Sequence, residues 1–111
     1  MTVRTNAKGV RGEREAAAVF QTAGFAARGL ESAGDWLVVS KDGRTLHVEV
    51  KRHERLRIPE WLQQVEADCP QGVEWVLAFR QNRRGWFGVQ PLAVIAAREA
   101  RLAELEAMVG R

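Results

Sequence analysis

The chain has 111 residues, of which 46% are hydrophobic and 28% charged, and its formal net charge is +3. This composition is that of an ordinary globular protein, and the length suits one domain with one hydrophobic core. It contains neither an apolar run of membrane-spanning length nor a signal peptide, so we expect a cytoplasmic protein without a membrane partner. The lone cysteine, Cys69, excludes an internal disulfide and a cysteine-rich zinc site, and we expect it to be a buried apolar filler.

The chain begins with a predicted helix over residues 6–23, where apolar residues recur at helical spacing before Gly24 offers a stop. Glu13 lies on or beside this apolar stripe, which allows its carboxylate to point inward. A short strand is predicted over residues 25–30. If it points inward, the Glu13 carboxylate would lie between this helix and the sheet that follows.

Two further strands, at residues 35–40 and 44–51, flank the hairpin signal KDG. A two-residue turn would set Asp35 opposite Val50, out of phase with Glu49. A three-residue loop with Gly43 left-handed instead sets Asp35 opposite Glu49, where directly paired side chains share a face. We favour the second register because it brings two carboxylates together where a cation could hold them.

The strand segment Thr45–Arg52, TLHVEVKR, alternates apolar and polar residues with a period of two. Leucine and valine occupy one face, and His47, Glu49 and Lys51 occupy the other. One interpretation is an exposed strand with an ion pair on its outer face, and the other is a strand whose polar face carries chemistry. His47 shares that face but is given no role, because an isolated strand histidine is more often a surface or hydrogen-bonding residue.

The second half of the chain predicts a helix over residues 59–69, a largely buried strand over 73–80 and a shorter strand over 86–89. A final helix is predicted over residues 91–109, where Ile95, Leu102 and Val109 recur at intervals of seven residues. This apolar stripe could pack onto its own domain or form a dimer contact, and the sequence favours neither. The predicted fold class is α/β, with a central mixed five-stranded sheet in the order αβββαββ plus a C-terminal helix. We expect one domain over residues 1–111, with its core at about 6–90.

Two carboxylates on adjacent strands predict a site for a divalent cation. Asp35 and Glu49 would supply oxygen ligands, the backbone carbonyl of Val50 a third, and Glu13 a further acidic group. Magnesium is the expected metal and manganese the alternative. Lys51, on the same face, would hold a water nucleophile and balance developing negative charge.

Basic residues concentrate in three segments of the sequence. If the fold brings the three together they form a face suited to a polyanion; otherwise they are scattered arginines that solubilise the surface. The candidate DNA-binding residues are Lys8, Arg11, Arg14, Arg52, Arg55, Arg57, Arg80, Arg83 and Arg84.

Several motifs together carry a family resemblance. Gly34-Asp35 followed by Glu49-Val50-Lys51 resembles the Asp, then Glu-x-Lys signature of the restriction-endonuclease-like nucleases. KGVRGERE at residues 8–15, GFAAR, HVEVK and Gly85-Trp86 together are similar to the archaeal-type Holliday junction resolvases, including relatives carried by phages. The resemblance spans roughly residues 6–90.

This resemblance implies that Glu13, Asp35, Glu49 and Lys51 are catalytic, and that Arg14 lies on the DNA. It also implies a homodimer that makes paired symmetric nicks in a four-way DNA junction. Gly34 stands where the wider superfamily often has proline, a position that does no chemistry. The connection at residues 31–34 is short where the family has an arm over the DNA, so nuclease activity is more secure than junction preference.

The sequence therefore predicts a magnesium-dependent endonuclease that acts on branched DNA. It would act in the cytoplasm, or in the host cytoplasm if a phage encodes it. The alternatives are a general repair or replication nuclease on branched or duplex DNA, and a non-catalytic nucleic-acid-binding module of the same fold. The four intact site residues argue against the binding module.

Overall fold

The computed structural model describes residues 7–30 and 35–110, with side chains described from residue 11 onward. Its elements follow the predicted order, with bounds shifted by at most one residue. They are α1 (Ala7–Thr22), β1 (Ala26–Gly29), β2 (Asp35–Val39), β3 (Thr45–Arg52), α2 (Ile58–Asp68), β4 (Glu74–Arg80), β5 (Phe87–Val89) and α3 (Leu92–Val109).

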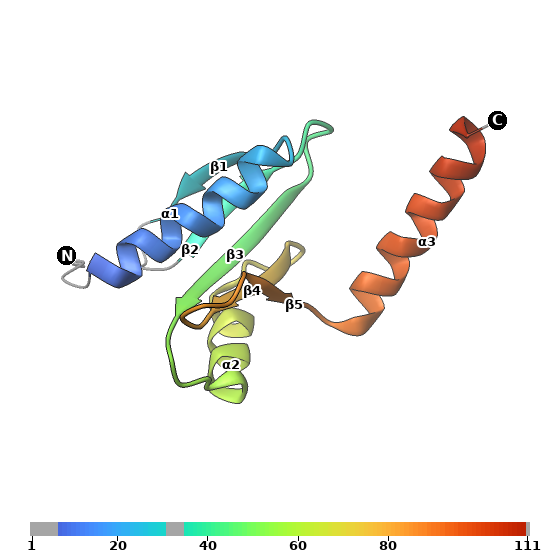
Figure 1. Ribbon diagram of the computed structural model, residues 1–111. Helices are drawn as coiled ribbons and strands as arrows, with labels where there is room; N and C mark the ends of the chain where they lie inside the picture. The colour runs from blue at the N-terminus through green and yellow to red at the C-terminus, as the bar shows by residue number, and fades with distance from the viewer. Residues whose placement is uncertain (1–6, 31–34, 111) are drawn as a thin grey trace.

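The five strands form one mixed sheet in the order β1-β2-β3-β4-β5. Neighbouring strands are antiparallel except β3 and β4, which are parallel. A parallel pair needs a crossover connection, and α2 supplies it between these two strands. The predicted mixed five-stranded sheet is confirmed, with β3 at its centre (Figure 1).

The turn between β2 and β3 determines which side chains face one another. The backbone N–H of Ser40 donates to the carbonyl oxygen of Arg44 at 2.9 Å, and Gly43 has a φ of 88°. This left-handed conformation suits glycine and completes a three-residue loop. Asp35 consequently lies directly opposite Glu49, which confirms the favoured register.

Helices cover both faces of the central sheet (Figure 1). On the α1 face, Ala16 packs with Val48, Val50 and other strand residues in the main hydrophobic core. On the other face, α2 buries Trp61 and Val65. The face of β3 that carries Glu49 is therefore buried beneath α2, and the interpretation as an exposed strand is wrong.

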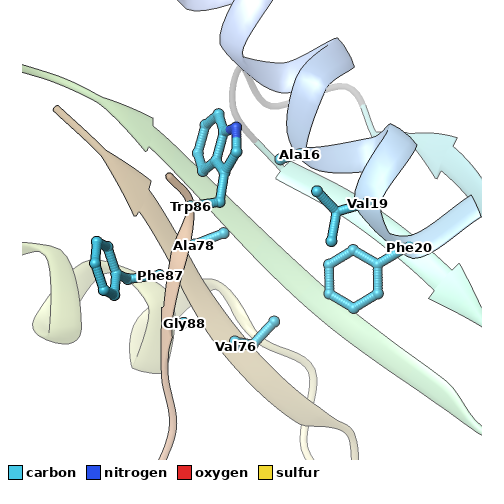
Figure 2. A pocket seen from close by; sticks show the side chains of 8 residues that line it. All are labelled: Ala16, Val19, Phe20, Val76, Ala78, Trp86, Phe87 and Gly88. Atoms are coloured by element: carbon cyan, nitrogen blue, oxygen red, sulfur yellow. The ribbon is translucent and has the colours of Figure 1, made fainter. Parts of the chain in front are cut away.

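An apolar groove remains beside α1 on the side of β4 and β5. Its volume is about 120 Å³, and Figure 2 shows Val19 and Phe20 of α1 facing Val76, Trp86 and Gly88 across it. Val19 is more than half exposed at the rim. The core is thus closed over β3 but open along this edge of the sheet.

Helix α3 projects away from the sheet and contributes no buried residue (Figure 1). Polar contacts hold its base: Arg98 donates to the side chain of Gln90 at 2.8 Å, and Gln90 donates to the carbonyl of Trp75 at 3.0 Å. Of the two predictions for this helix, packing onto its own domain is wrong. In the described part of the chain, no helix has both the length and the apolar character needed to cross a membrane.

Cys69 follows α2 and differs from the prediction of a buried filler. It is only partly buried, and its thiol lies 3.1 Å from the carbonyl oxygen of Val73. Burial raises the pKa of this thiol. Its extended backbone ends the helix, because Pro70 follows and disfavours helical geometry in the preceding residue.

Candidate active site

Three buried polar side chains meet on the α2 face of the sheet. Asp35 is 4% exposed, His47 2% and Glu49 0%. One oxygen or nitrogen from each lies within 4.8 Å of the others, and Nε2 of His47 is 3.7 Å from Oδ1 of Asp35. The strand register brings them together, because Asp35 opposes Glu49 and His47 lies two residues before Glu49 on the same face.

The electrostatic environment of Asp35 combines burial with several charges. Burial raises the pKa of this carboxyl, with further increases from the carboxylates of Asp68 and Glu13, while His47 and Lys51 oppose the change. Desolvation disfavours the charged form and is the largest cause. A cation would stabilise the charged form that burial disfavours.

Glu13 reaches this environment from α1, which covers the other face of the sheet. Its side chain is 5% exposed, so the carboxylate points inward. It acts on Asp35 through its charge, which contributes to the raised pKa of Asp35. Sequence periodicity alone allows this inward orientation, and the packing of α1 on the sheet establishes it.

The side chain of Lys51 lies on the same face of β3 and contacts both β3 and α2. Its Nζ lies 3.1 Å from Oε1 of Glu49 and donates to Oε1 of Gln64 on α2 at 2.8 Å. Burial lowers the pKa of Lys51, against the opposing charges of Asp35 and Asp68. The ammonium group is thus fixed beside the carboxylates by α2.

The donor set fits a divalent cation. Oδ1 of Asp35 and Oε2 of Glu49 are buried, and neither has a hydrogen-bond partner among the described residues. Buried carboxylate oxygens without partners are costly, and a bound cation would compensate this cost. The side chain of Val50 lies in the hydrophobic core on the α1 face. That its carbonyl oxygen is a metal ligand stays a prediction.

One residue from each basic segment lines a single polar concavity against α1. Arg11 of α1, Arg52 of β3 and Arg80 of β4 surround a volume of about 310 Å³, together with Glu15 and Asn82. Arg80 already makes two hydrogen bonds within the protein. It donates to the Glu15 carboxylate at 2.7 Å and to the carbonyl oxygen of Arg84 at 2.6 Å. The fold therefore brings the three basic segments together.

The remaining candidate DNA-binding residues whose side chains the structure describes lie at exposed positions. Arg83 has a φ of 63°, in the left-handed region that is unfavourable for a side chain of its size. The side chain of Lys8 and the connection at residues 31–34, with Gly34, lie outside the described residues. The exposed candidates are Arg14, Arg55, Arg57, Arg83 and Arg84.

Three residues near the site have no role that the sequence assigns. The alternation of β3 places His47 on the polar face but does not identify it as a neighbour of Asp35. Gln64 and Asp68 come from α2, and only the packing of α2 over β3 brings them close. Helical spacing offers one signal, because Gln64 lies three residues after the buried Trp61 and so neighbours it on the surface of the helix.

The comparisons with known proteins agree with this arrangement. The chain is similar to Hjc, a Holliday junction resolvase from the archaeal hyperthermophile Archaeoglobus fulgidus, with 27% sequence identity and a TM-score of 0.58. The match covers 76% of this chain and 73% of that one. No protein-family model and no curated protein sequence matches the chain. The chain thus has a restriction-endonuclease-like fold, and its predicted resemblance to the archaeal-type Holliday junction resolvases is confirmed.

Proposed function

We propose that this protein is a metal-dependent DNA endonuclease that resolves four-way junctions by paired symmetric nicks. The observation that carries the proposal is the direct opposition of buried Asp35 and Glu49, with Lys51 on the same face. These residues lie on a fold shared with a Holliday junction resolvase. The site would act in the cytoplasm, or in the host cytoplasm if a phage encodes the protein.

Asp35 and Glu49 would hold the cation, with the Val50 carbonyl and Glu13 as further candidates. Magnesium is the expected cation and manganese the alternative. A divalent cation here would neutralise charge on the scissile phosphate and lower the pKa of water. Lys51 would place a positive charge beside the attacking oxygen and the developing phosphate charge. Gln64 would position Lys51 by accepting a hydrogen bond from its Nζ.

The polar concavity beside α1 supplies the expected contacts to the DNA backbone. Arg11 and Arg52 present guanidinium groups there, and Arg52 is the residue after Lys51. Guanidinium groups bind phosphate oxygens and position a nucleic acid without reading its sequence. Because successive residues of β3 point to opposite faces, Arg52 would hold a phosphate that neighbours the carboxylates along the DNA backbone rather than the phosphate that they attack.

Paired nicks require two active sites, so we propose a homodimer with α3 as a contact between its subunits. The apolar residues Ile95, Leu102 and Leu105 on α3 have no cover from their own domain. We expect Leu102→Glu to convert a dimer to a monomer in light-scattering measurements of molar mass. The adjacent change Ala103→Glu lies outside the apolar stripe and should leave the mass unchanged. A monomer in the unmodified protein would contradict this assembly.

Cleavage of an immobile four-way junction tests the proposed function. The purified protein would be incubated with the junction and magnesium or manganese, with linear duplex as competitor. We expect paired symmetric nicks that the competitor does not suppress. Glu49→Ala should abolish cleavage and retain junction binding, because Glu49 serves the cation rather than the phosphate contacts. Glu66→Ala, at an exposed position of α2, is the matched control and should cleave normally.

The other outcomes separate the alternative functions. Equal cleavage of linear and branched DNA would indicate a general nuclease. Tight binding without cleavage under either metal would indicate a binding module. Loss of both binding and cleavage in Glu49→Ala would contradict the role assigned to Glu49.

A further inference from the structure

His47 is a buried imidazole that the proposed chemistry leaves without a function. Its Nε2 atom is buried and has no hydrogen-bond partner among the described residues. Its cross-strand neighbours, Leu37 and Trp75, offer no side-chain acceptor, because leucine is apolar and the indole N–H only donates. Oδ1 of Asp35 lies 3.7 Å from Nε2, too far for a hydrogen bond, so a ligand placed between the two atoms would satisfy both.

The geometry points to a metal ligand. We propose that His47 binds the catalytic cation directly through Nε2, beside Asp35 and Glu49, and that the site therefore prefers a transition metal such as Mn²⁺ to Mg²⁺. This inference rests on the proposed metal-dependent function. It adds a ligand and a metal preference that the paired carboxylates alone do not imply.

The distances fit an octahedral site after a small contraction. Metal–ligand bonds of roughly 2.1 Å place neighbouring ligands about 3.0 Å apart and opposite ligands about 4.2 Å apart. The Asp35 and His47 atoms are 3.7 Å apart, and all three donor atoms lie within 4.8 Å of one another. The Asp35–His47 pair would close by about 0.7 Å to become neighbouring ligands, and a pair at the full 4.8 Å would close by about 0.6 Å to become opposite ligands.

A ligand role also explains the electrostatics of the cluster. Asp35 and Glu49 place two carboxylates in a buried site, where Nζ of Lys51 lies 3.1 Å from Oε1 of Glu49. A divalent cation between them would neutralise both carboxylates, whereas the neutral imidazole would add a donor without further charge. Imidazole is a ligand of first-row transition metals, for which the affinity of a site with a nitrogen donor rises from Mn²⁺ to the later metals, whereas magnesium prefers oxygen ligands and retains water.

Pulsed electron paramagnetic resonance of bound Mn²⁺ tests this inference without any DNA. The full-length protein, free of any histidine tag, would be titrated with Mn²⁺ and examined for modulation of the spin echo by a coordinated ¹⁴N nucleus. We expect one nitrogen coupling in the unmodified protein and its loss in His47→Asn. His53→Asn is the matched control, because His53 is the other histidine of the chain and is exposed. It should retain the coupling.

Calorimetry of metal binding gives a second readout. We expect His47→Asn to weaken Mn²⁺ binding by at least about 10-fold, in the range found when groups around a metal are removed. Mg²⁺ binding should change much less, so the Mn²⁺ preference should fall. His47→Gln provides a second substitution, and circular dichroism without metal would establish that each variant folds.

The outcomes distinguish this inference from the proposed function. Bound Mn²⁺ without nitrogen coupling in the unmodified protein would overturn the ligand role of His47 and leave the carboxylate site in place. Coupling that persists in His47→Asn and disappears in His53→Asn would also overturn it. Failure of the unmodified protein to bind any divalent cation would overturn both this inference and the metal-dependent function.

Discussion

Gly12 of α1 lies directly against Arg52 of β3: a Cβ atom at Gly12 would stand 2.8 Å from the Cβ of Arg52 and 3.1 Å from its Cγ. Only glycine allows this approach, because real Cβ contacts are longer. The close approach brings the next helix residue, Glu13, to a buried position near the sheet. One small residue thus sets the distance between the helix-borne acid and the strands that carry the other site residues.

Gly12→Ala should destabilise the protein despite the better helix propensity of alanine. Overpacking costs about 1–3 kcal/mol, whereas alanine in place of glycine in a helix contributes about 1 kcal/mol. We expect a net decrease of up to about 2 kcal/mol in the free energy of unfolding, measured by urea denaturation. Ala18→Gly, at an exposed position of the same helix, would calibrate the propensity effect. An increase in stability for Gly12→Ala would show that α1 does not pack closely on Arg52.

Asp35→Asn should stabilise the protein when no cation is present. Burial raises the pKa of Asp35, so its charged form is unfavourable there, and the substitution removes one of two opposed carboxylates. With a chelator present to remove divalent cations, we expect the free energy of unfolding to increase by about 1 kcal/mol. This is within the range of single substitutions that relieve a destabilised functional site. Added divalent cation should then stabilise the variant less than the unmodified protein. Glu66→Gln, an exposed change of the same kind, should have no effect, and a less stable Asp35→Asn would contradict this account.

Gln64→Ala should lower the turnover number by roughly 10-fold, the effect of removing a hydrogen bond to a charged group worth about 1.4 kcal/mol. Gln64 holds Lys51 in place and lies outside the expected DNA contacts, so KM should change little. Single-turnover and steady-state cleavage of the junction would measure both quantities. Gln63→Ala changes the adjacent exposed residue of α2 and should leave both unchanged. Equal effects of the two substitutions would remove the positioning role of Gln64.

Arg11→Ala and Arg52→Ala should each weaken binding to all DNA sequences alike. Each arginine lines the polar concavity, and removing one arginine–phosphate interaction should reduce the slope of log affinity against log salt by about 1. Fluorescence anisotropy over a range of salt concentrations would measure the slope. Arg44→Ala removes an arginine from the turn that precedes β3, at the end away from Arg52, and should not change the slope. An unchanged slope in both concavity variants would place the DNA elsewhere.

The local features of the candidate site could be predicted from the sequence. The alternation in TLHVEVKR assigns Glu49 and Lys51 to one face, and the KDG turn with left-handed Gly43 sets Asp35 opposite Glu49. These relations involve residues close in the chain, and backbone geometry and hydrogen bonding decide them without knowledge of the rest of the fold.

The sequence by itself thus determined the order of the elements, the paired carboxylates and the lysine beside them. Only the tertiary structure decided that His47 is buried next to Asp35, that Gln64 holds Lys51, and that Arg11, Arg52 and Arg80 share one concavity. It also left α3 without buried residues. The physical reason is that contacts between distant segments depend on how whole helices pack to bury apolar surface. That packing is a sum over many weak interactions, which no short motif records.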